Sequence, residues 1–512
     1  MNAKLLDKQI AATCRKNKVS LRHARHVADL SETLYEKTRH VNGLTKTARP
    51  LVRCSAMLHQ VASKLQGDDE PVVGKLGKLL EDVDQLSDAQ KRICAAAAKL
   101  GPTTADITAM VRSLSANPDD TEMQIAARIA AVIRISIGLD DSQTQDTDIE
   151  AVQDTGEEIR IVAKGTSGVV RDAQTAHSHG NLWNDLLIRP VQVIHSNTPC
   201  SSYLPVIQPA QPISESVRRV LQRLVEKLWS LEYGLDFDED PEYVHEMRVA
   251  TRRIRTALSM ISDSLGPQGG YWSGEFGWLA KALGDVRDMD VMIEMVGAYR
   301  PEAPRTHGPA LDDLITSLNR SRGIYRSKLI KAIGSPRYEK LSSGFGRAVQ
   351  NPIGSLQGLQ AVGPRAGEPT STEARRILIG QIDELAGIGR DISDKTPDQL
   401  HQIRLQCKAL RYSIEFFSDL YGSRLDDLRS GAEQLQDLLG EVHDFDVWVE
   451  RVEAHEKRNE DDKAALRASK ALKKYLSSLR QERLQKAFGK WKSFTRPKAL
   501  AELRDQACDP RP

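Results

Sequence analysis

Two short segments of the chain place one histidine and three basic residues at the same spacing. They are VHEMRVATRRIRTAL at Val244–Leu258 and LHQIRLQCKALRYSI at Leu400–Ile414. An α-helix turns by about 100° per residue, so in the first segment these four side chains fall within about 80° of one another. They are His245, Arg248, Arg252 and Arg255. Like charges at such spacings repel each other and weaken the helix slightly, so the grouping indicates a ligand of opposite charge.

The second segment repeats this basic face. Its members are His401, Arg404, Lys408 and Arg411, followed by the aromatic Tyr412. Apolar residues lie on the opposite side of both helices, as Met247 and Ile254 do in the first and Ile403 and Leu410 in the second. Each segment therefore predicts a helix with one face in a core and one basic face. We expect the two basic faces to line one surface.

A second motif follows each basic segment, as LGDVRDMDV at Leu283–Val291 and LGEVHDFDV at Leu439–Val447. His245 to His401 and Gly284 to Gly440 are both separations of 156 residues. This shared spacing indicates a duplicated unit. The aspartates of the motif carry the wrong charge for an anion, and we expect them to orient arginines through charge-assisted hydrogen bonds. They are Asp288, Asp290, Asp444 and Asp446.

A solvated outer face is the alternative interpretation of each basic stripe. Arginines on one face of a single helix are ordinarily just exposed to water, and this reading stays open for either segment taken alone. It must also account for a histidine, three cations and a following glycine–aspartate motif that recur in the same order. The repetition therefore favours anion binding.

Together the two motifs resemble the CHAD domain, the conserved-histidine α-helical domain, over residues 214–494. The resemblance implies two four-helix bundles with pseudo-two-fold symmetry, whose basic residues face a shared groove or pore. It also implies binding of inorganic polyphosphate, often at polyphosphate granules. His443 departs from the pattern, because the first repeat has Arg287 at this point, and this puts the ion pairing of the second half in doubt.

The predicted polyphosphate-binding residues combine both stripes with further cations, and no cofactor is expected. They are His245, Arg248, Arg252, Arg253, Arg255, Lys281, Arg287, Arg322, Arg326, Lys328, His401, Arg404, Lys408, Arg411 and Tyr412. Weaker candidates on later helices are Lys331, Lys473, Lys474, Arg480 and Arg483.

The N-terminal part of the chain resembles the helical HD-type domain at the C-terminal end of exopolyphosphatases, over about residues 10–195. Residues around His23, His59 and Asp140 are the basis of this similarity. Active HD phosphohydrolases hold a divalent metal with an adjacent histidine and aspartate, and the metal activates water. Gln60 occupies the place of that aspartate. We therefore interpret His23, His59 and Asp140 as a vestigial set, and expect neither metal binding nor catalysis.

The composition limits the class of protein. Hydrophobic residues make up 40% of the 512, aromatic residues 5% and charged residues 28%, which is typical of a helical protein in water. No apolar run approaches the length of a membrane-spanning helix, and the first residues lack a signal core. Six scattered cysteines indicate neither a disulfide framework nor a zinc site. We expect a cytoplasmic protein, with no membrane partner and a possible place at polyphosphate granules.

The predicted organisation is mainly α-helical, and its parts follow changes in composition. Amphipathic helices at Leu21–Thr38, Arg49–Leu65, Asp88–Leu100 and Glu122–Gly138 precede short strands at Glu158–Ala163 and Leu187–Ile194. The predicted divisions are an HD-like domain at 1–195 with a small strand-bearing subdomain, a proline-rich linker at 196–213, and a CHAD domain at 214–500 with repeats at 214–350 and 373–494. We expect residues 205–500 to fold alone.

The predicted function is non-catalytic polyphosphate binding. An HD-type phosphohydrolase that uses the C-terminal module to hold polyphosphate or a nucleotide is the first alternative. Binding of nucleic acid by the same basic faces is the second, since phosphate backbones attract the same side chains. The stripes offer few aromatic side chains for base stacking, and Tyr412 is the main candidate, which argues against nucleic acid.

Overall fold

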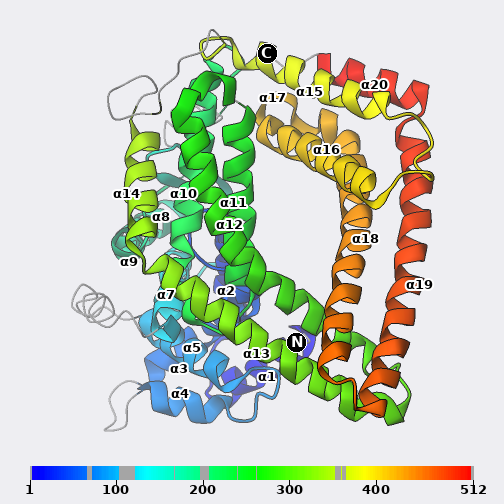
Figure 1. The fold of residues 1–512 in the computed structure, drawn as a ribbon. Helices are drawn as coiled ribbons and strands as arrows, with labels where there is room; N and C mark the ends of the chain where they lie inside the picture. The colour runs from blue at the N-terminus through cyan, green and yellow to red at the C-terminus, as the bar shows by residue number, and fades with distance from the viewer. Residues whose placement is uncertain are drawn as a thin grey trace. The chain divides into compact units, whose positions relative to one another are not determined.

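The structure is a computed structural model, and it describes the chain in nine segments. These are residues 3–65, 72–102, 121–166, 168–195, 207–238, 240–260, 262–351, 359 and 365–508. Contacts divide the chain into two compact units. The N-terminal unit comprises Met1–Leu204 with Arg223–Ala250, and the C-terminal unit comprises Pro205–Gln222 with Thr251–Pro512. Figure 1 shows the helices that dominate both.

Helices form most of the N-terminal unit. Their bounds are α1 Ala3–Lys16, α2 Leu21–Lys37, η1 Lys46–Ala48, α3 Arg49–Lys64, α4 Val72–Leu80, α5 Asp88–Leu100 and α7 Thr121–Gly138. α5 begins with a capping box, in which Ser87 accepts from the amide of Gln90 and the Gln90 side chain accepts from the amide of Ser87. α7 is buried along most of its length and packs against α2, α3 and α5. The four predicted helices agree with α2, α3, α5 and α7 to within a residue.

A small sheet follows α7. Its strands are β1 Asp148–Asp154, β2 Ile159–Lys164 and β3 Val191–His195, with β1 antiparallel and β3 parallel to the central β2. The two short helices α8 Val169–Ser178 and α9 Asn181–Leu186 form the connection between β2 and β3. Ile159, Ile161 and Ala163 of β2 are fully buried, as expected for alternate residues on the covered face of a sheet. The predicted strand-bearing subdomain is present.

Residues 223–250 pack with the N-terminal unit, although sequence analysis assigned them to the CHAD domain. A buried ion network holds them there. Arg189 is only 3% exposed and binds both Asp154 of β1 and Glu226. Arg223 Nε lies 3.2 Å from Asp154 Oδ2. Burial opposes the charge of Asp154, but a hydrogen bond to His40 and the two arginines outweigh it and lower its pKa to about 2.

A second set of contacts fixes the start of the first basic helix to the same unit. The carboxylate of Glu246 accepts from Arg39 at 2.8 Å and lies 2.9 Å from Lys227 Nζ. Tyr233 donates to the carbonyl of Gly43. Buried charges left without partners are costly, so this packing argues against the expectation that residues 205–500 fold alone.

The region 207–508 contains the longest described helices, α12, α13, α18 and α19. The helices of the first repeat are α10 Ile213–Ser230, η2 Glu232–Asp236, α11 Glu242–Met260, α12 Ser262–Tyr299, η3 Arg305–His307, α13 Gly308–Ile333 and α14 Pro336–Gln350. Those of the second are α15 Thr370–Gly387, α16 Pro397–Phe416, α17 Ser418–Tyr421, η4 Gly422–Leu425, α18 Asp426–Arg458, α19 Lys463–Phe494 and α20 Pro497–Cys508. The main helices recur in the same order, as α10, α11, α12, α13 and α14 in the first repeat and α15, α16, α18, α19 and α20 in the second.

The hydrophobic core of the C-terminal unit joins the two repeats. The hairpins α12–α13 and α18–α19 each consist of two long helices side by side, as Figure 1 shows for α18 and α19. Met289 and Met292 of α12, Leu314 of α13, Phe445 of α18 and Leu472 of α19 belong to one buried cluster. This cluster places both glycine–aspartate motifs in a common core.

Two predicted segments lie mainly outside the described residues. They are most of the linker at 196–213 and much of the segment 351–372 between the two predicted repeats. Where the chain is described again, a β-bridge joins Pro212 to Pro369, so the starts of the two repeats lie beside each other. The domain boundaries themselves stay a prediction. Within the described ranges, no helix has the length and apolar character required to cross a bilayer.

Candidate functional site

α11 carries the first basic stripe. Ala250, Ile254, Ala257 and Leu258 are buried, and the glutamate Glu242 in its first turn suits the positive end of the helix dipole. The stripe residues are half-buried or exposed on the other side of this helix. They are His245, Arg248, Arg252 and Arg255, and the neighbouring Arg253 is also exposed. The helical period predicted from the sequence is confirmed.

α16 carries the second stripe, and its start is strongly specified. Thr396 and Gln399 form a capping box, and Pro397 occupies the first turn, where its missing N–H costs nothing. Ile403, Leu410 and Ile414 face the core. The stripe residues are all half-buried, so their stems pack against protein. They are His401, Arg404, Lys408 and Arg411.

The two stripes meet where α11 approaches α16. Arg253 Nη2 lies 2.8 Å from Glu415 Oε2, and the other oxygen of Glu415 accepts from Arg411 Nε at 3.0 Å. The guanidinium of Arg252 lies over the ring of Tyr412, 5.0 Å from its centroid. These contacts join α11 to α16 within the C-terminal unit, and a single surface formed by both stripes stays a prediction.

Tyr412 is an internal spacer between the two helices. It is 3% exposed. The Arg411 guanidinium lies 5.8 Å from the centroid of its ring, which the Arg252 guanidinium also contacts. Burial raises the pKa of Tyr412, although both arginines oppose this rise. Its hydroxyl has no hydrogen-bond partner among the described residues. Tyr412 therefore holds arginines through its ring, and it offers little surface to a ligand.

The last aspartate of each glycine–aspartate motif binds an arginine of the following helix. Arg322 Nε of α13 donates to Asp290 Oδ1 at 2.5 Å. In the second repeat, Arg480 of α19 donates to both oxygens of Asp446, at 2.6 and 3.1 Å. The predicted role of orienting an arginine is thus confirmed for Asp290 and Asp446. Arg480 was only a weak candidate, and its position 34 residues after Asp446 could be matched to the 32 between Asp290 and Arg322 only with the structure.

Gly440 makes room for Arg404. A Cβ atom at Gly440 would lie 3.3 Å from Arg404 Nε, so a side chain there would press on the guanidinium. This Nε is buried and has no hydrogen-bond partner among the described residues. The glycine of the motif therefore lets an arginine of the stripe lie against the backbone of α18.

His401 and His443 line a cleft of about 390 Å³ in the second repeat, together with Asp446 and Arg480. The two imidazole rings are 5.0 Å apart between centroids. Burial and the neighbouring His443 and Arg404 lower the pKa of His401. At neutral pH this histidine is therefore a neutral hydrogen-bonding group, and its positive charge appears only in acid.

The cations of the predicted site differ in their partners. Lys281 pairs with Asp285 at 3.2 Å, and Lys328 lies over the ring of Tyr325. Arg252, Arg322, Arg326 and Lys408 also interact with neighbours. Four arginines form no ion pair or hydrogen bond with any residue that the structure describes, and these are Arg248, Arg255, Arg287 and Arg404. Their charges are the ones available to an added anion.

The carboxylates beside Arg411 were not predicted from the sequence. Besides Glu415, Arg411 contacts Glu433 at 2.8 Å and Asp437 at 3.9 Å. Glu415 follows Arg411 by four residues, and that spacing alone predicts a pair on one helix. Glu433 and Asp437 come from α18, and no local signal connects them with α16.

The three vestigial metal-site candidates lie together in the N-terminal unit. His23 Nδ1 is 2.5 Å from Asp140 Oδ2, and His23 Nε2 is 3.1 Å from His59 Nε2. His59 Nδ1 contacts the carbonyl of Ala56. Burial lowers the pKa of His59 to about 4. Both ring nitrogens of each histidine thus face groups of the protein, and no metal-binding group of three was found among the described residues.

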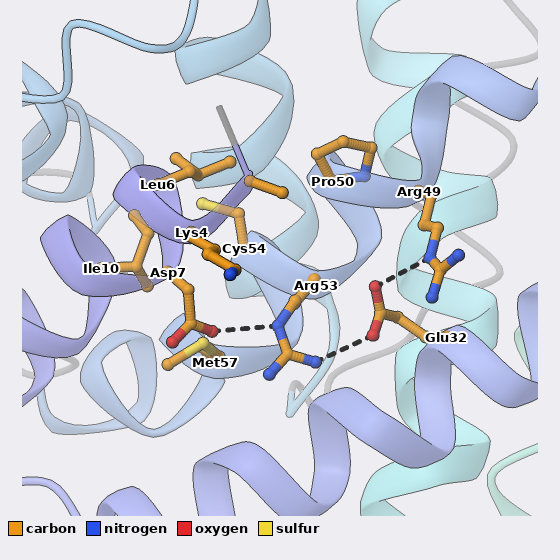
Figure 2. Close-up of a pocket in the computed structure, with 11 residues that line it drawn as sticks. Lys4, Leu6, Asp7, Ile10, Glu32, Arg49, Pro50, Arg53, Cys54 and Met57 are labelled. Atoms are coloured by element: carbon orange, nitrogen blue, oxygen red, sulfur yellow. Dashed lines mark hydrogen bonds and ion pairs between the residues drawn. The ribbon is translucent and has the colours of Figure 1, made fainter. Parts of the chain in front are cut away.

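A pocket of about 500 Å³ opens among α1, α2 and α3 of the same unit. Figure 2 shows Arg53 between Asp7 and Glu32, with Arg49 on the far side of Glu32. The contacts measure 3.0 Å from Arg53 Nε to Asp7, 2.8 Å from Arg53 Nη1 to Glu32 and 3.1 Å from Arg49 Nε to Glu32. The polar rim is largely paired internally, unlike Arg248, Arg255, Arg287 and Arg404.

Comparison with known families identifies the central part of the chain. Residues 219–453 match the CHAD domain. Two uncharacterised proteins of Mycobacterium tuberculosis, from strains CDC 1551 and H37Rv, are each 28% identical over 251 residues, which is 47% of this chain and 46% of theirs. The matched region thus spans about half the length of these curated relatives.

Two solved structures also overlap the chain. The CHAD domain of the plant Ricinus communis covers 62% of this chain and 98% of its own, at 21% identity and a TM-score of 0.43. PptA from Streptomyces chartreusis covers 55% of this chain and 99% of its own, at 15% identity and a TM-score of 0.43.

Proposed function

Because residues 219–453 match the CHAD domain, we propose that this protein binds inorganic polyphosphate through the basic faces of α11 and α16 and does not cleave it. The observation behind this proposal is the set of four arginines without ion pairs. Two of them, Arg248 and Arg404, are equivalent positions of the two repeats. Charges held apart from carboxylates, three of them on half-buried stems, favour an anion that balances them.

A flexible chain of phosphates suits this arrangement. Arginine presents N–H groups in a planar fork that matches phosphate oxygens, and it keeps its charge at any physiological pH. The cations lie on separate helices, so successive phosphates of one chain can engage several of them. Lysine and histidine at Lys408 and His401 add hydrogen-bond donors along the same stripe.

The buried state of Tyr412 favours polyphosphate over nucleic acid. Single-stranded nucleic acid is bound in large part by stacking of bases on exposed aromatic rings. Tyr412 was the main aromatic candidate, and its ring is covered by Arg252 and Arg411. Binding to the stripes therefore depends on phosphate contacts, which RNA and DNA present on a bulkier backbone.

The histidine network supports a non-catalytic N-terminal region. A metal-bound water mechanism needs ligand atoms that converge on an open coordination position. His23 and His59 direct their Nε2 atoms at each other, and Gln60 has no carboxylate to offer. In this proposal residues 1–195 form an HD-like domain that holds α11 in place, and the protein associates with polyphosphate granules in the cytoplasm.

A competition experiment tests the proposed ligand. A fluorescent long-chain polyphosphate is bound to the full-length protein and displaced with unlabelled polyphosphate, single-stranded RNA or ATP. We expect displacement by polyphosphate at far lower phosphate concentration than by RNA or ATP. Equal displacement by RNA would favour the nucleic-acid alternative, and release of phosphate that His59→Gln abolishes would favour the phosphohydrolase.

A further inference from the structure

The two basic stripes end differently, although their sequences correspond. Arg255 is the last cation of the first stripe, and Arg411 occupies the equivalent position 156 residues later. Both belong to the C-terminal unit. The residues around the two arginines have opposite charge, and this difference determines which one is available to an anion.

Arg411 is surrounded by carboxylates. Glu415 and Glu433 lie 3.0 and 2.8 Å from its guanidinium, and Asp437 lies at 3.9 Å. Although burial opposes the charge, Glu415 and Glu433 outweigh it and raise the pKa of Arg411. Burial and the nearby Glu433 and Glu441 raise the pKa of Asp437, as expected where negative charges crowd together. An added phosphate would meet net negative charge here.

Arg255 has none of these neighbours. The positions equivalent to Glu415, Glu433 and Asp437 are Ser259, Gly277 and Lys281 in the first repeat. A Cβ atom at Gly277 would lie 3.8 to 3.9 Å from the Arg255 guanidinium, so this glycine faces the arginine as Glu433 faces Arg411. Arg255 is exposed and forms no ion pair with any described residue. A serine, a glycine and a lysine thus replace the three acidic residues that surround Arg411.

We infer that the Arg255 end of α11 grips the phosphate chain and that the equivalent Arg411 end of α16 does not. This inference rests on the proposed function and specifies which end of the two stripes holds the phosphate chain. The chain is held by Arg255 and Lys281 in the first repeat, and it is repelled by Glu433 and Asp437 in the second. Arg411 is then a structural residue, whose ion pairs with Glu415 link it to Arg253 of α11.

The ion pair of Lys281 does not remove it from this end. Lys281 is 77% exposed and its partner Asp285 is 36% exposed. Exposed pairs of this kind contribute little, because water and salt screen them and the side chains lose freedom on pairing. A phosphate can therefore displace Asp285 easily. The triple contact of Arg411 is better buried, with the arginine only 17% exposed.

The two repeats provide matched variants for a test. Gly277→Glu gives the first repeat the carboxylate of the second, and Gly277→Gln adds the same side chain without its charge. Ordinary contact distances around Gly277 allow either side chain, and both favour the helix over glycine equally well. The new carboxylate would also lie one helical turn from Lys281.

We expect Gly277→Glu to bind polyphosphate at least about fivefold more weakly than Gly277→Gln, a factor that corresponds to one partly exposed charge contact. In the opposite direction, the double variant Glu433→Gln, Asp437→Asn should bind more tightly than the wild type, because Arg411 is freed. Affinities are measured by titration at fixed salt, with thermal melting of every variant as the control for folding.

Each outcome has a distinct meaning. If wild-type protein binds polyphosphate and the two Gly277 variants bind it equally, the inference is wrong while the proposed function stands. If the double variant Glu433→Gln, Asp437→Asn does not bind more tightly than the wild type, the claim that these carboxylates repel the phosphate chain is wrong. Absence of polyphosphate binding by the wild type overturns the proposed function together with this inference.

Discussion

Replacing Arg248 and Arg404 together should weaken polyphosphate binding without unfolding the protein. These arginines are equivalent in the two repeats, and neither forms an ion pair with a described residue. Glutamine keeps most of the volume and a hydrogen-bond donor but removes the charge. Because no carboxylate loses its partner, the double variant Arg248→Gln, Arg404→Gln should change binding far more than stability.

The magnitude follows from the number of charges lost. A partly exposed charge contact contributes about 1 kcal/mol, so two contribute about 2 kcal/mol, or about 30-fold in affinity. Counterion release gives a second estimate. Each contact on a flexible single strand contributes about 0.7 to the slope of log affinity against log salt. By analogy, the slope of the double variant should be shallower by about 1.4.

The assay is equilibrium titration with long-chain polyphosphate at several salt concentrations. The control is Lys8→Gln, Arg375→Gln, which removes the same net charge at two exposed positions outside the stripes and without described ion partners. Circular dichroism and thermal melting verify folding. If the two double variants bind equally at every salt concentration, the stripes are solvated surface and the assignment of the site is refuted.

Three further predictions concern the framework of the site. Asp154→Asn should lower the free energy of unfolding by about 3 kcal/mol, because Arg189 is left buried with an incomplete set of partners. The pKa of Asp154 is lowered from 3.8 to about 2, so in urea titrations this difference from the wild type should persist above about pH 4 and vanish toward pH 2. Tyr412→Phe should leave the melting temperature unchanged or raise it slightly, since its hydroxyl has no partner among the described residues; a clear loss of stability would show that it has one. Removal of residues 1–204 should lower the melting temperature of the remaining chain, because Glu226 loses Arg189; an unchanged melting curve would contradict the role assigned to this ion network.

Local periodicity predicted the parts of the fold that depend on one helix at a time. The spacing of Arg248 and Arg404 placed both on basic faces, and α5 was predicted with the bounds Asp88–Leu100 that the structure shows. The repeat also identified Asp290 as a partner for arginines. These features depend on the helical period and on the order of charges, which are written directly in the sequence.

Contacts between distant segments could not be predicted in this way. The amphipathic pattern of α10 shows that it buries one face, but it does not reveal that Arg189 will meet Glu226. In the same way, the sequence around Arg411 does not predict its contact with Glu433, which belongs to another helix. An equal spacing of motifs predicts equal folds, whereas the balance of charge around each repeat depends on single residues such as Gly277 that no periodic pattern marks.

The most direct test of the central claim is the salt dependence of polyphosphate binding by the full-length protein. Four arginines without ion pairs, each contributing about 0.7, predict a slope of about −3 for log affinity against log salt. We predict tight binding at low salt that weakens along this slope. Binding that is absent at low salt, or that does not change with salt, would contradict the claim that the basic faces of α11 and α16 bind polyphosphate.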